Sequence, residues 1–223
     1  MIDRLYDYRF ELFLSSQIFI LFGTILVPID WFEVWIMPIL LLCNIASGIL
    51  LIKKKKHLFR LFIAFFVIAF VINITGFLEQ AVNSISNSIK LGSYFIFYGI
   101  VTIEIIHQVW KAKVVGKNVI LGLISGFISL GLLSFFLCLT IEMFYPNSFS
   151  GLIESTGTDM TEQLMYYSYI TLMTIGYGDI LPITPIAQKA AVFIGLIGQF
   201  YLVILTAIVV GKYINQSSEH SNS

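Results

Sequence analysis

The sequence has few charged residues and few cysteines, and both shortages limit what the protein can be. Only 12% of its 223 residues are charged, 58% are hydrophobic and the net charge is zero. This composition is typical of membrane proteins and argues against nucleic acid as a partner. The two cysteines, Cys43 and Cys138, lie inside apolar runs, which indicates buried free thiols. The sequence shows no cluster of nucleophile, base and metal-ligating residues, so we expect neither an enzyme nor a cofactor.

Long apolar segments are what the sequence has in abundance. A bilayer core of about 30 Å needs roughly 20 mostly apolar residues per helix. Six segments meet that length, namely 10–29, 34–52, 58–78, 91–110, 118–143 and 186–212. We therefore predict an all-α membrane protein with six transmembrane helices. A four-helix N-terminal membrane domain would occupy residues 1–113, a second domain residues 114–215, and a disordered cytoplasmic tail residues 216–223.

Lysine and arginine are unevenly distributed between the two ends of these segments. With the N-terminus inside, 11 of the 13 lie on the cytoplasmic side, and only Lys90 and Lys189 lie outside. Positive charge accumulates on the cytoplasmic side of membrane proteins. This bias predicts a multi-pass protein of the cell membrane with both termini in the cytoplasm. The connection 144–185 would then enter the membrane from the outer side.

The connection 144–185 contains a segment that helix propensity does not explain. Residues 160–172, MTEQLMYYSYITL, suit a helix of about 20 Å, which is too short to span a bilayer. The string TIGYG follows, whose two glycines weaken a helix, and Pro182 prevents a simple return to helix. This pattern predicts a re-entrant loop. Non-helical backbone at membrane depth is tolerated only where it is buried in protein or lines a water-filled path.

An extended TIGYG backbone can point successive carbonyls in one direction, because glycine permits the unusual dihedral angles. Four such strips around an axis form rings of oxygens that replace the water shell of a monovalent cation. The string TLMTIGYGDILP, between two spans, resembles the signature of the tetrameric P-loop potassium channels. This resemblance covers about residues 118–213 and makes 114–215 a pore domain of outer helix, pore helix, filter and inner helix.

The resemblance implies a role for each residue of the strip. The carbonyls of Thr174, Ile175, Gly176 and Tyr177 would line a K⁺ selectivity filter, and the Thr174 hydroxyl would add the innermost ring. Isoleucine stands at position 175 where the usual string has valine, and both are β-branched and apolar. Met173 stands at the cavity roof, where many members have threonine or serine.

The resemblance also implies residues that support the filter. Gly178 and Asp179 would shape the outer mouth. In many family members two tryptophans on the pore helix hydrogen-bond the filter tyrosine and the acid. Tyr166 and Tyr167 occupy the matching positions here, and their hydroxyls would take over these bonds.

The last span carries glycines that allow two interpretations. Gly198 lies 19 residues after Asp179, the spacing at which the family often has a gating hinge, and Gly195 is nearby. Alternatively, both glycines simply permit close helix packing.

The fourth span lacks the repeated arginines that a voltage sensor needs. We therefore expect a channel with weak or no voltage dependence. Glu104 and His107 lie one turn apart on this span. They either sense protons or lie near the cytoplasmic interface, with their polar ends reaching water.

These features predict a passive, potassium-selective channel that works as a homotetramer in the lipid membrane. K⁺ would be the transported ion and not a cofactor. Two alternatives are the membrane subunit of a potassium uptake transporter and a nonselective cation channel. The sequence does not identify the stimulus that opens the gate.

Overall fold

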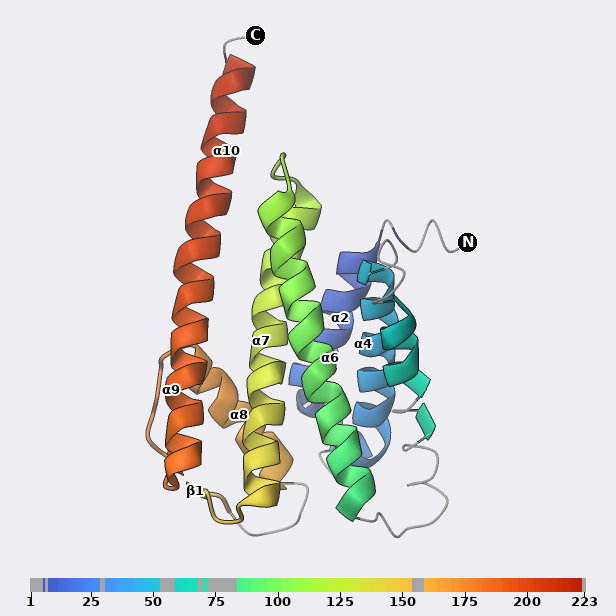
Figure 1. The fold of residues 1–223 in the computed structure, drawn as a ribbon, viewed down its shortest axis with the longest axis vertical. Coiled ribbons are helices and arrows are strands. Elements are labelled where there is room, and N and C mark those ends of the chain that lie inside the picture. The colour runs from blue at the N-terminus through green and yellow to red at the C-terminus, as the bar shows by residue number, and fades with distance from the viewer. Residues whose placement is uncertain are drawn as a thin grey trace.

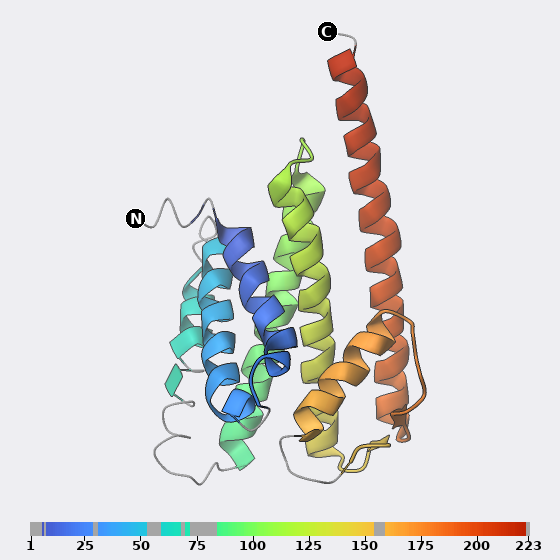
Figure 2. The ribbon, with the colours of Figure 1, turned by 180° about the vertical axis from the view of Figure 1, so that it is seen from behind.

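The computed structural model describes residue 6 and residues 8–28, 31–52, 59–67, 70–71, 84–153 and 159–221 as a bundle of helices (Figure 1). The main helices are α2 (Arg9–Phe22), α4 (Met37–Ile52), α6 (Ser84–Lys111), α7 (Lys117–Phe144), α8 (Asp159–Leu172), α9 (Pro185–Phe200) and α10 (Thr206–Ser221). A 3₁₀ turn, Gly23–Ile25, follows α2, and π-helical turns Phe32–Ile36 and Tyr201–Leu205 precede α4 and join α9 to α10. In Figures 1 and 2, α6 and α7 occupy the middle of the bundle. The helices α2 and α4 lie on one side of them, and α8 to α10 lie on the other.

Three helices within the described residues are long and apolar enough to cross a membrane, namely Ser88–Lys111, Lys117–Phe144 and Pro185–Ser218. They coincide with the predicted fourth, fifth and sixth spans. The first predicted span contains α2, whose 14 residues make a helix of about 21 Å, short of the bilayer core. The second contains α4, a shorter apolar helix that the π-helical turn precedes. The third, 58–78, lies partly outside the described residues.

Aromatic side chains form the core between α6 and α7. The rings of Tyr94 and Tyr98 both stack on Phe136, with centroids 5.1 and 5.6 Å apart. All three side chains are buried. Tyr94 and Tyr98 are four residues apart and therefore share one face of α6. Because aromatic side chains bury large areas, this seam holds α6 against α7.

Polar side chains join α2 and α4 to the rest of the bundle. The Gln17 amide donates a hydrogen bond of 2.8 Å to the Ser129 hydroxyl on α7. The Asn44 amide donates to the Ser16 hydroxyl at 2.8 Å and accepts from the Tyr98 hydroxyl at 2.9 Å. All five side chains are buried. Interhelical hydrogen bonds of this kind are typical of helix association in membranes.

The C-terminal helix is tied to the far end of α6. The Lys212 ammonium donates to the carbonyls of Trp110 at 2.5 Å and Ala112 at 2.8 Å. A cation beside the last carbonyls of a helix is favourable because those carbonyls lack intrahelical partners and carry partial negative charge. The α6–α7 connection is held as well, since the Val115 amide donates to the Gln216 side chain at 3.0 Å.

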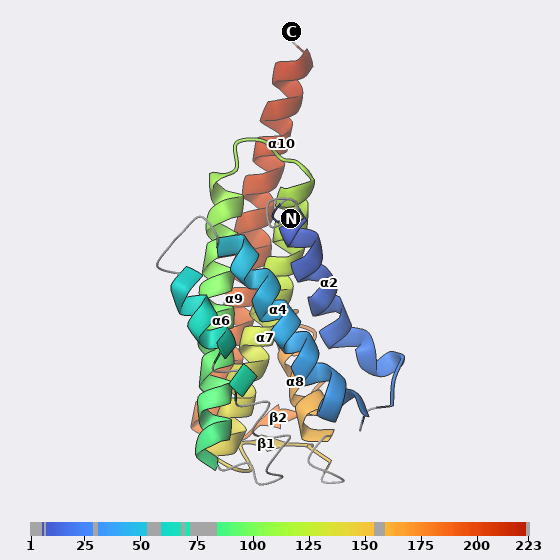
Figure 3. The ribbon, with the colours of Figure 1, turned by 90° about the vertical axis from the view of Figure 1, so that its right-hand side faces the viewer.

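Residues 216–221, which fall within the tail predicted to be disordered over 216–223, are helical. Helix α10 continues to Ser221 and projects past the other helices (Figures 1 and 3). The bond between Val115 and Gln216 lies inside the predicted tail, so a tertiary contact stabilises helix where the polar composition indicated disorder.

Two short strands bring the ends of the connection between α7 and α9 together. Strand β1 (Phe149–Ser150) pairs antiparallel with β2 (Leu181–Pro182). The turn before β1 is held by Glu142, whose carboxylate accepts from the amides of Asn147 at 2.6 Å and Ser148 at 3.0 Å. The segment between the strands, which contains α8 and the TIGYG string, therefore begins and ends at the same end of the bundle.

Candidate functional site

The short helix α8 lies between α7 and α9 (Figure 2). Its 14 residues make a helix of about 21 Å. The Tyr169 hydroxyl donates to the Ile128 carbonyl of α7 at 2.7 Å. A Cβ at Gly131 would overlap the Tyr169 ring, so glycine at this position lets α8 approach α7 closely. These contacts set where α8 ends and where the TIGYG string begins.

The chain leaves the helix gradually after Leu172. The amide of Thr174 donates to the Thr171 carbonyl at 3.0 Å, and the amide of Ile175 donates to the Ile170 carbonyl at 2.9 Å. Helical hydrogen bonding ends there. Figure 2 shows the chain turning at the end of α8 and returning along the flank of α9 toward β2.

Every second residue of the returning strip has a left-handed backbone. The φ angles of Thr174, Gly176 and Gly178 are 58°, 58° and 82°, whereas Ile175 and Tyr177 keep the usual negative φ. In a β-strand, successive peptide groups point to opposite sides. The sign of φ therefore alternates along the strip 174–178, a pattern that neither a regular α-helix nor a regular β-strand has.

The residues of the strip are exposed within the protomer. Tyr177 is 73% exposed and Ile175 is 48% exposed. The adjoining α9 also exposes large apolar side chains, including Phe193 and Phe200. Figures 1 and 2 both place the strip at the edge of the bundle, away from α2 and α4.

Tyr166 and Asp179 meet where the strip ends. The Tyr166 hydroxyl donates a hydrogen bond to the Asp179 carboxylate. This bond lowers the pKa of Asp179 and raises the pKa of Tyr166, because it stabilises the ionised carboxylate and the protonated phenol. The Asp179 carbonyl packs against Gly151, where a Cβ would overlap the oxygen. Asp179 is therefore held between α8 and the segment that follows β1.

Tyr167 lies elsewhere, although it is adjacent in sequence. Its side chain is buried, and its ring lies 5.1 Å from that of Phe149. Its hydroxyl hydrogen-bonds the Thr171 side chain on the same helix. The structure thus brings one of the two tyrosines to Asp179 and turns the other toward the interior of the protomer.

The two glycines of α9 have different surroundings. A Cβ at Gly198 would overlap the Leu172 carbonyl oxygen at the end of α8, whereas nothing lies within 4 Å of one at Gly195. Gly198 therefore has the close contact that the packing interpretation requires. The inner helix departs from α-helical geometry a few residues later, in the π-helical turn Tyr201–Leu205. Such turns often occur at functional sites and at bends.

Gln199 is a site residue that the sequence reasoning missed. Its side-chain amide donates a hydrogen bond of 3.0 Å to the Thr174 hydroxyl, which links α9 to the first residue of the strip. The signal was available, because Gln199 is the only amide side chain in the apolar run 190–213. The sequence does not show that Gln199 and Thr174, which are 25 residues apart, lie close together in the fold.

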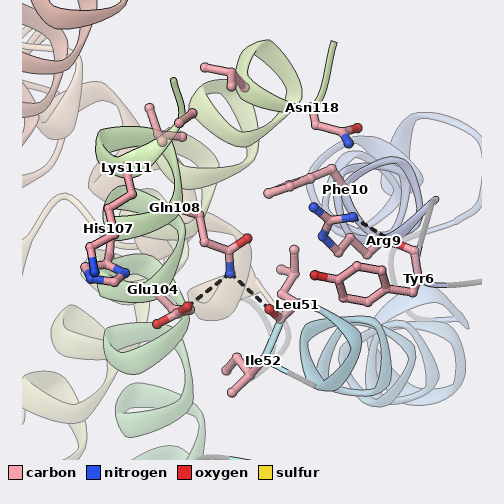
Figure 4. Close-up of a pocket in the computed structure, with 13 residues that line it drawn as sticks. Tyr6, Arg9, Phe10, Leu51, Ile52, Glu104, His107, Gln108, Lys111 and Asn118 are labelled. Carbon is pink, nitrogen blue, oxygen red and sulfur yellow. Dashed lines mark hydrogen bonds between the residues drawn. The ribbon is translucent and has the colours of Figure 1, made fainter. Parts of the chain in front are cut away.

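Glu104 and His107 border a cavity of about 410 Å³ between α6, α2 and the end of α4 (Figure 4). Glu104 is buried and accepts a hydrogen bond of 3.1 Å from the Gln108 amide, which also donates to the Leu51 carbonyl at 3.0 Å. Arg9 lies across this cavity, with its guanidinium over the ring of Tyr6. The Glu104 carboxylate is therefore hydrogen-bonded to Gln108 on its own helix.

One comparison with known proteins bears on this region. A family model described as ion channel matches residues 132–215, which include the second half of α7, α8, the strip, α9 and much of α10. No curated protein and no solved structure matches the chain significantly. The family match supports an ion channel, and together with the three long apolar helices it indicates a membrane protein.

Proposed function

We propose that the chain is one subunit of a homotetrameric, potassium-selective channel that conducts K⁺ passively. The observation that carries this proposal is the strip 174–178, in which positive and negative φ alternate directly after a half-length helix. We expect this alternation to point successive carbonyls to one side, where four strips around one axis would replace the hydration shell of K⁺. The carbonyls of Thr174, Ile175, Gly176 and Tyr177 would supply these oxygens.

The exposure of the strip supports the tetramer. Non-helical backbone in a bilayer must be buried in protein or line a water-filled path, because lipid satisfies no backbone hydrogen bonds. The protomer leaves this strip uncovered beside the exposed apolar face of α9. Four copies in closed rotational symmetry would cover the flanks of each strip with a neighbour and turn its carbonyls toward the shared axis.

Helix α8 would contribute to the electrostatics of the pore. Its C-terminal end precedes the strip, and the last carbonyls of a helix carry partial negative charge. Four such ends directed at the axis favour a cation below the filter. Asp179, held ionised by Tyr166, would add negative charge near the outer mouth.

Placement in the cell membrane with both termini in the cytoplasm follows from the positive-inside bias. In that orientation α8 and the strip enter from the outer side, as a re-entrant loop. Helix α6 contains no arginine, which supports weak or absent voltage dependence.

The test is ion selectivity of the purified protein reconstituted in lipid bilayers. Under opposed K⁺ and Na⁺ gradients, we expect a reversal potential close to that of a K⁺ electrode. Tyr177→Ala should lose this selectivity, whereas Tyr213→Ala, at an exposed tyrosine near the other end of the inner helix, should keep it. Equal permeability of the unmodified protein to K⁺ and Na⁺ would favour a nonselective cation channel. K⁺ uptake that requires a second subunit would favour the transporter.

A further inference from the structure

A second cavity, of about 350 Å³, is lined by none of the residues of the strip. It is bordered by α4, α6, α7 and the first turn of α8. Its walls are mostly apolar, with Tyr94 from α6, Phe136, Leu139 and Met143 from α7, and Met160 from α8. The cavity is distinct from the filter, and a binding site there does not depend on ion selectivity.

Lys90 is the only charged residue among those that line this cavity. Its side chain is partly buried, and it makes no ion pair or hydrogen bond with any residue that the structure describes. A partly buried ammonium group interacts favourably with an anion, so Lys90 gives this cavity a position where an anionic group can bind. The apolar walls next to it favour a hydrocarbon chain.

We propose that this cavity binds a single-chain fatty acid, with its carboxylate on the Lys90 ammonium and its chain along α7. One cation matches one carboxylate. The wall from Met143 to Phe135 spans eight residues of helix, or about 12 Å, which suits a medium-length chain. A volume of about 350 Å³ matches one such chain.

The position of Lys90 fits this amphiphile in the proposed membrane orientation. Lys90 lies in the second turn of α6, near the outer end of the helix, and Tyr94 lies deeper along it. The carboxylate would therefore lie near the outer interface while the chain points into the bilayer. Met160 and Thr161, at the start of α8, also line the cavity, so the bound chain would contact the helix that positions the strip.

The experiment is equilibrium binding of radiolabelled dodecanoate to the full chain in nanodiscs of phosphatidylcholine, with empty nanodiscs as background. We expect saturable binding of one molecule per subunit. Lys90→Gln should weaken it about tenfold or more, which is the contribution of a hydrogen bond between charged groups. Lys90→Arg should retain it. Lys189→Gln removes the other outer lysine, which is exposed and outside the cavity, and should leave binding unchanged.

Competition measurements test which chemical group of the ligand is recognised, and a cavity-filling variant tests where the ligand binds. Dodecanol, which has the same chain without the charge, should compete at least tenfold less well, and phosphatidylglycerol should not compete. Leu139→Trp, which fills the apolar wall, should abolish binding in protein that elutes as the same oligomer. Equal binding to Lys90→Gln, or equal competition by dodecanol, would overturn the carboxylate site. Competition by phosphatidylglycerol as strong as by dodecanoate would overturn it in favour of a lipid headgroup. None of these results depends on whether the channel selects K⁺.

Discussion

The N-terminal helices and the C-terminal region use polar residues inside apolar sequence in opposite ways. In α2 and α4, the amides of Gln17 and Asn44 are buried and bonded to neighbouring helices. In the strip 174–178, the polar backbone is exposed and the described chain leaves it uncovered. The buried amides of α2 and α4 therefore stabilise the protomer, whereas the exposed backbone of the strip is accessible to a ligand or to another subunit. The family match includes the strip but none of the first four predicted spans.

The largest effect should come from a left-handed glycine of the strip. Gly176 has a φ of 58°, and within its own protomer nothing lies within 4 Å of the place that a Cβ would occupy, so Gly176→Ala changes the backbone preference without a clash inside the protomer. A left-handed alanine costs about 1–2 kcal/mol in each subunit, and relaxing it turns a carbonyl away from the axis. We expect loss of K⁺ selectivity in the reversal potential.

Gly92→Ala is the matched control, because Gly92 in α6 also has nothing within 4 Å but lies in a helix. It should leave selectivity unchanged and should stabilise α6 by up to about 1 kcal/mol. A selective Gly176→Ala channel would show that the alternating backbone is not what selects the ion.

The second effect should come from Gly198. In Gly198→Ala the new methyl group meets the Leu172 carbonyl, and the end of α8 must shift at a cost of about 1–3 kcal/mol. We expect a lower melting temperature of the oligomer and reduced current. Gly195→Ala has open space and should keep the melting temperature. Unchanged stability of Gly198→Ala together with a lower open probability would support the hinge interpretation instead.

The third effect should come from Gln199, which joins the inner helix to the strip. In Gln199→Leu the Thr174 hydroxyl loses the donor that holds it, at a cost of about 1 kcal/mol. We expect block by internal Ba²⁺, a divalent ion of nearly the same size as K⁺, to weaken about fivefold. Gln188→Leu, at the far end of α9, should have no effect on this block. Additive effects of Gln199→Leu and Thr174→Val would contradict a direct coupling between the two side chains.

The smallest effect should come from the exposed pair Tyr166 and Asp179. The pKa of Asp179 lies below its ordinary value of 3.8, because the Tyr166 hydroxyl stabilises the ionised carboxylate. This contribution of the hydrogen bond to the stability of the folded protein is present at neutral pH and is lost as the pH falls through the lowered pKa. Tyr166→Phe should return this pKa toward 3.8, and acid inactivation of the current should then begin at a higher pH. Tyr145→Phe, at another exposed tyrosine, should leave the profile unchanged. Identical acid profiles of Tyr166→Phe and the unmodified protein would exclude a role for this bond at the mouth.

Much of the C-terminal region was predictable, because its signals are local. The half-length helix predicted at 160–172 is observed as Asp159–Leu172, and it ends four residues before Gly176, the first glycine of the string. The fourth, fifth and sixth spans were recognisable from apolar length alone. The ends of the helices in the first two segments were harder to predict. Helix α2 ends before the turn at Gly23–Ile25, and α4 is preceded by a π-helical turn. The apolar composition of these segments does not indicate either turn.

Thus the sequence by itself determined the composition of a membrane protein, the short helix and the glycine-bearing strip, because chain length, hydrophobicity and glycine act within a few neighbouring residues. Only the tertiary structure decided which tyrosine reaches Asp179 and that Gly198 packs on Leu172. It alone revealed that Gln199 holds Thr174 and that Lys90 faces an apolar cavity. Each of these facts depends on the angle and depth at which separate helices pack, and contacts across such distances leave no local pattern in one sequence.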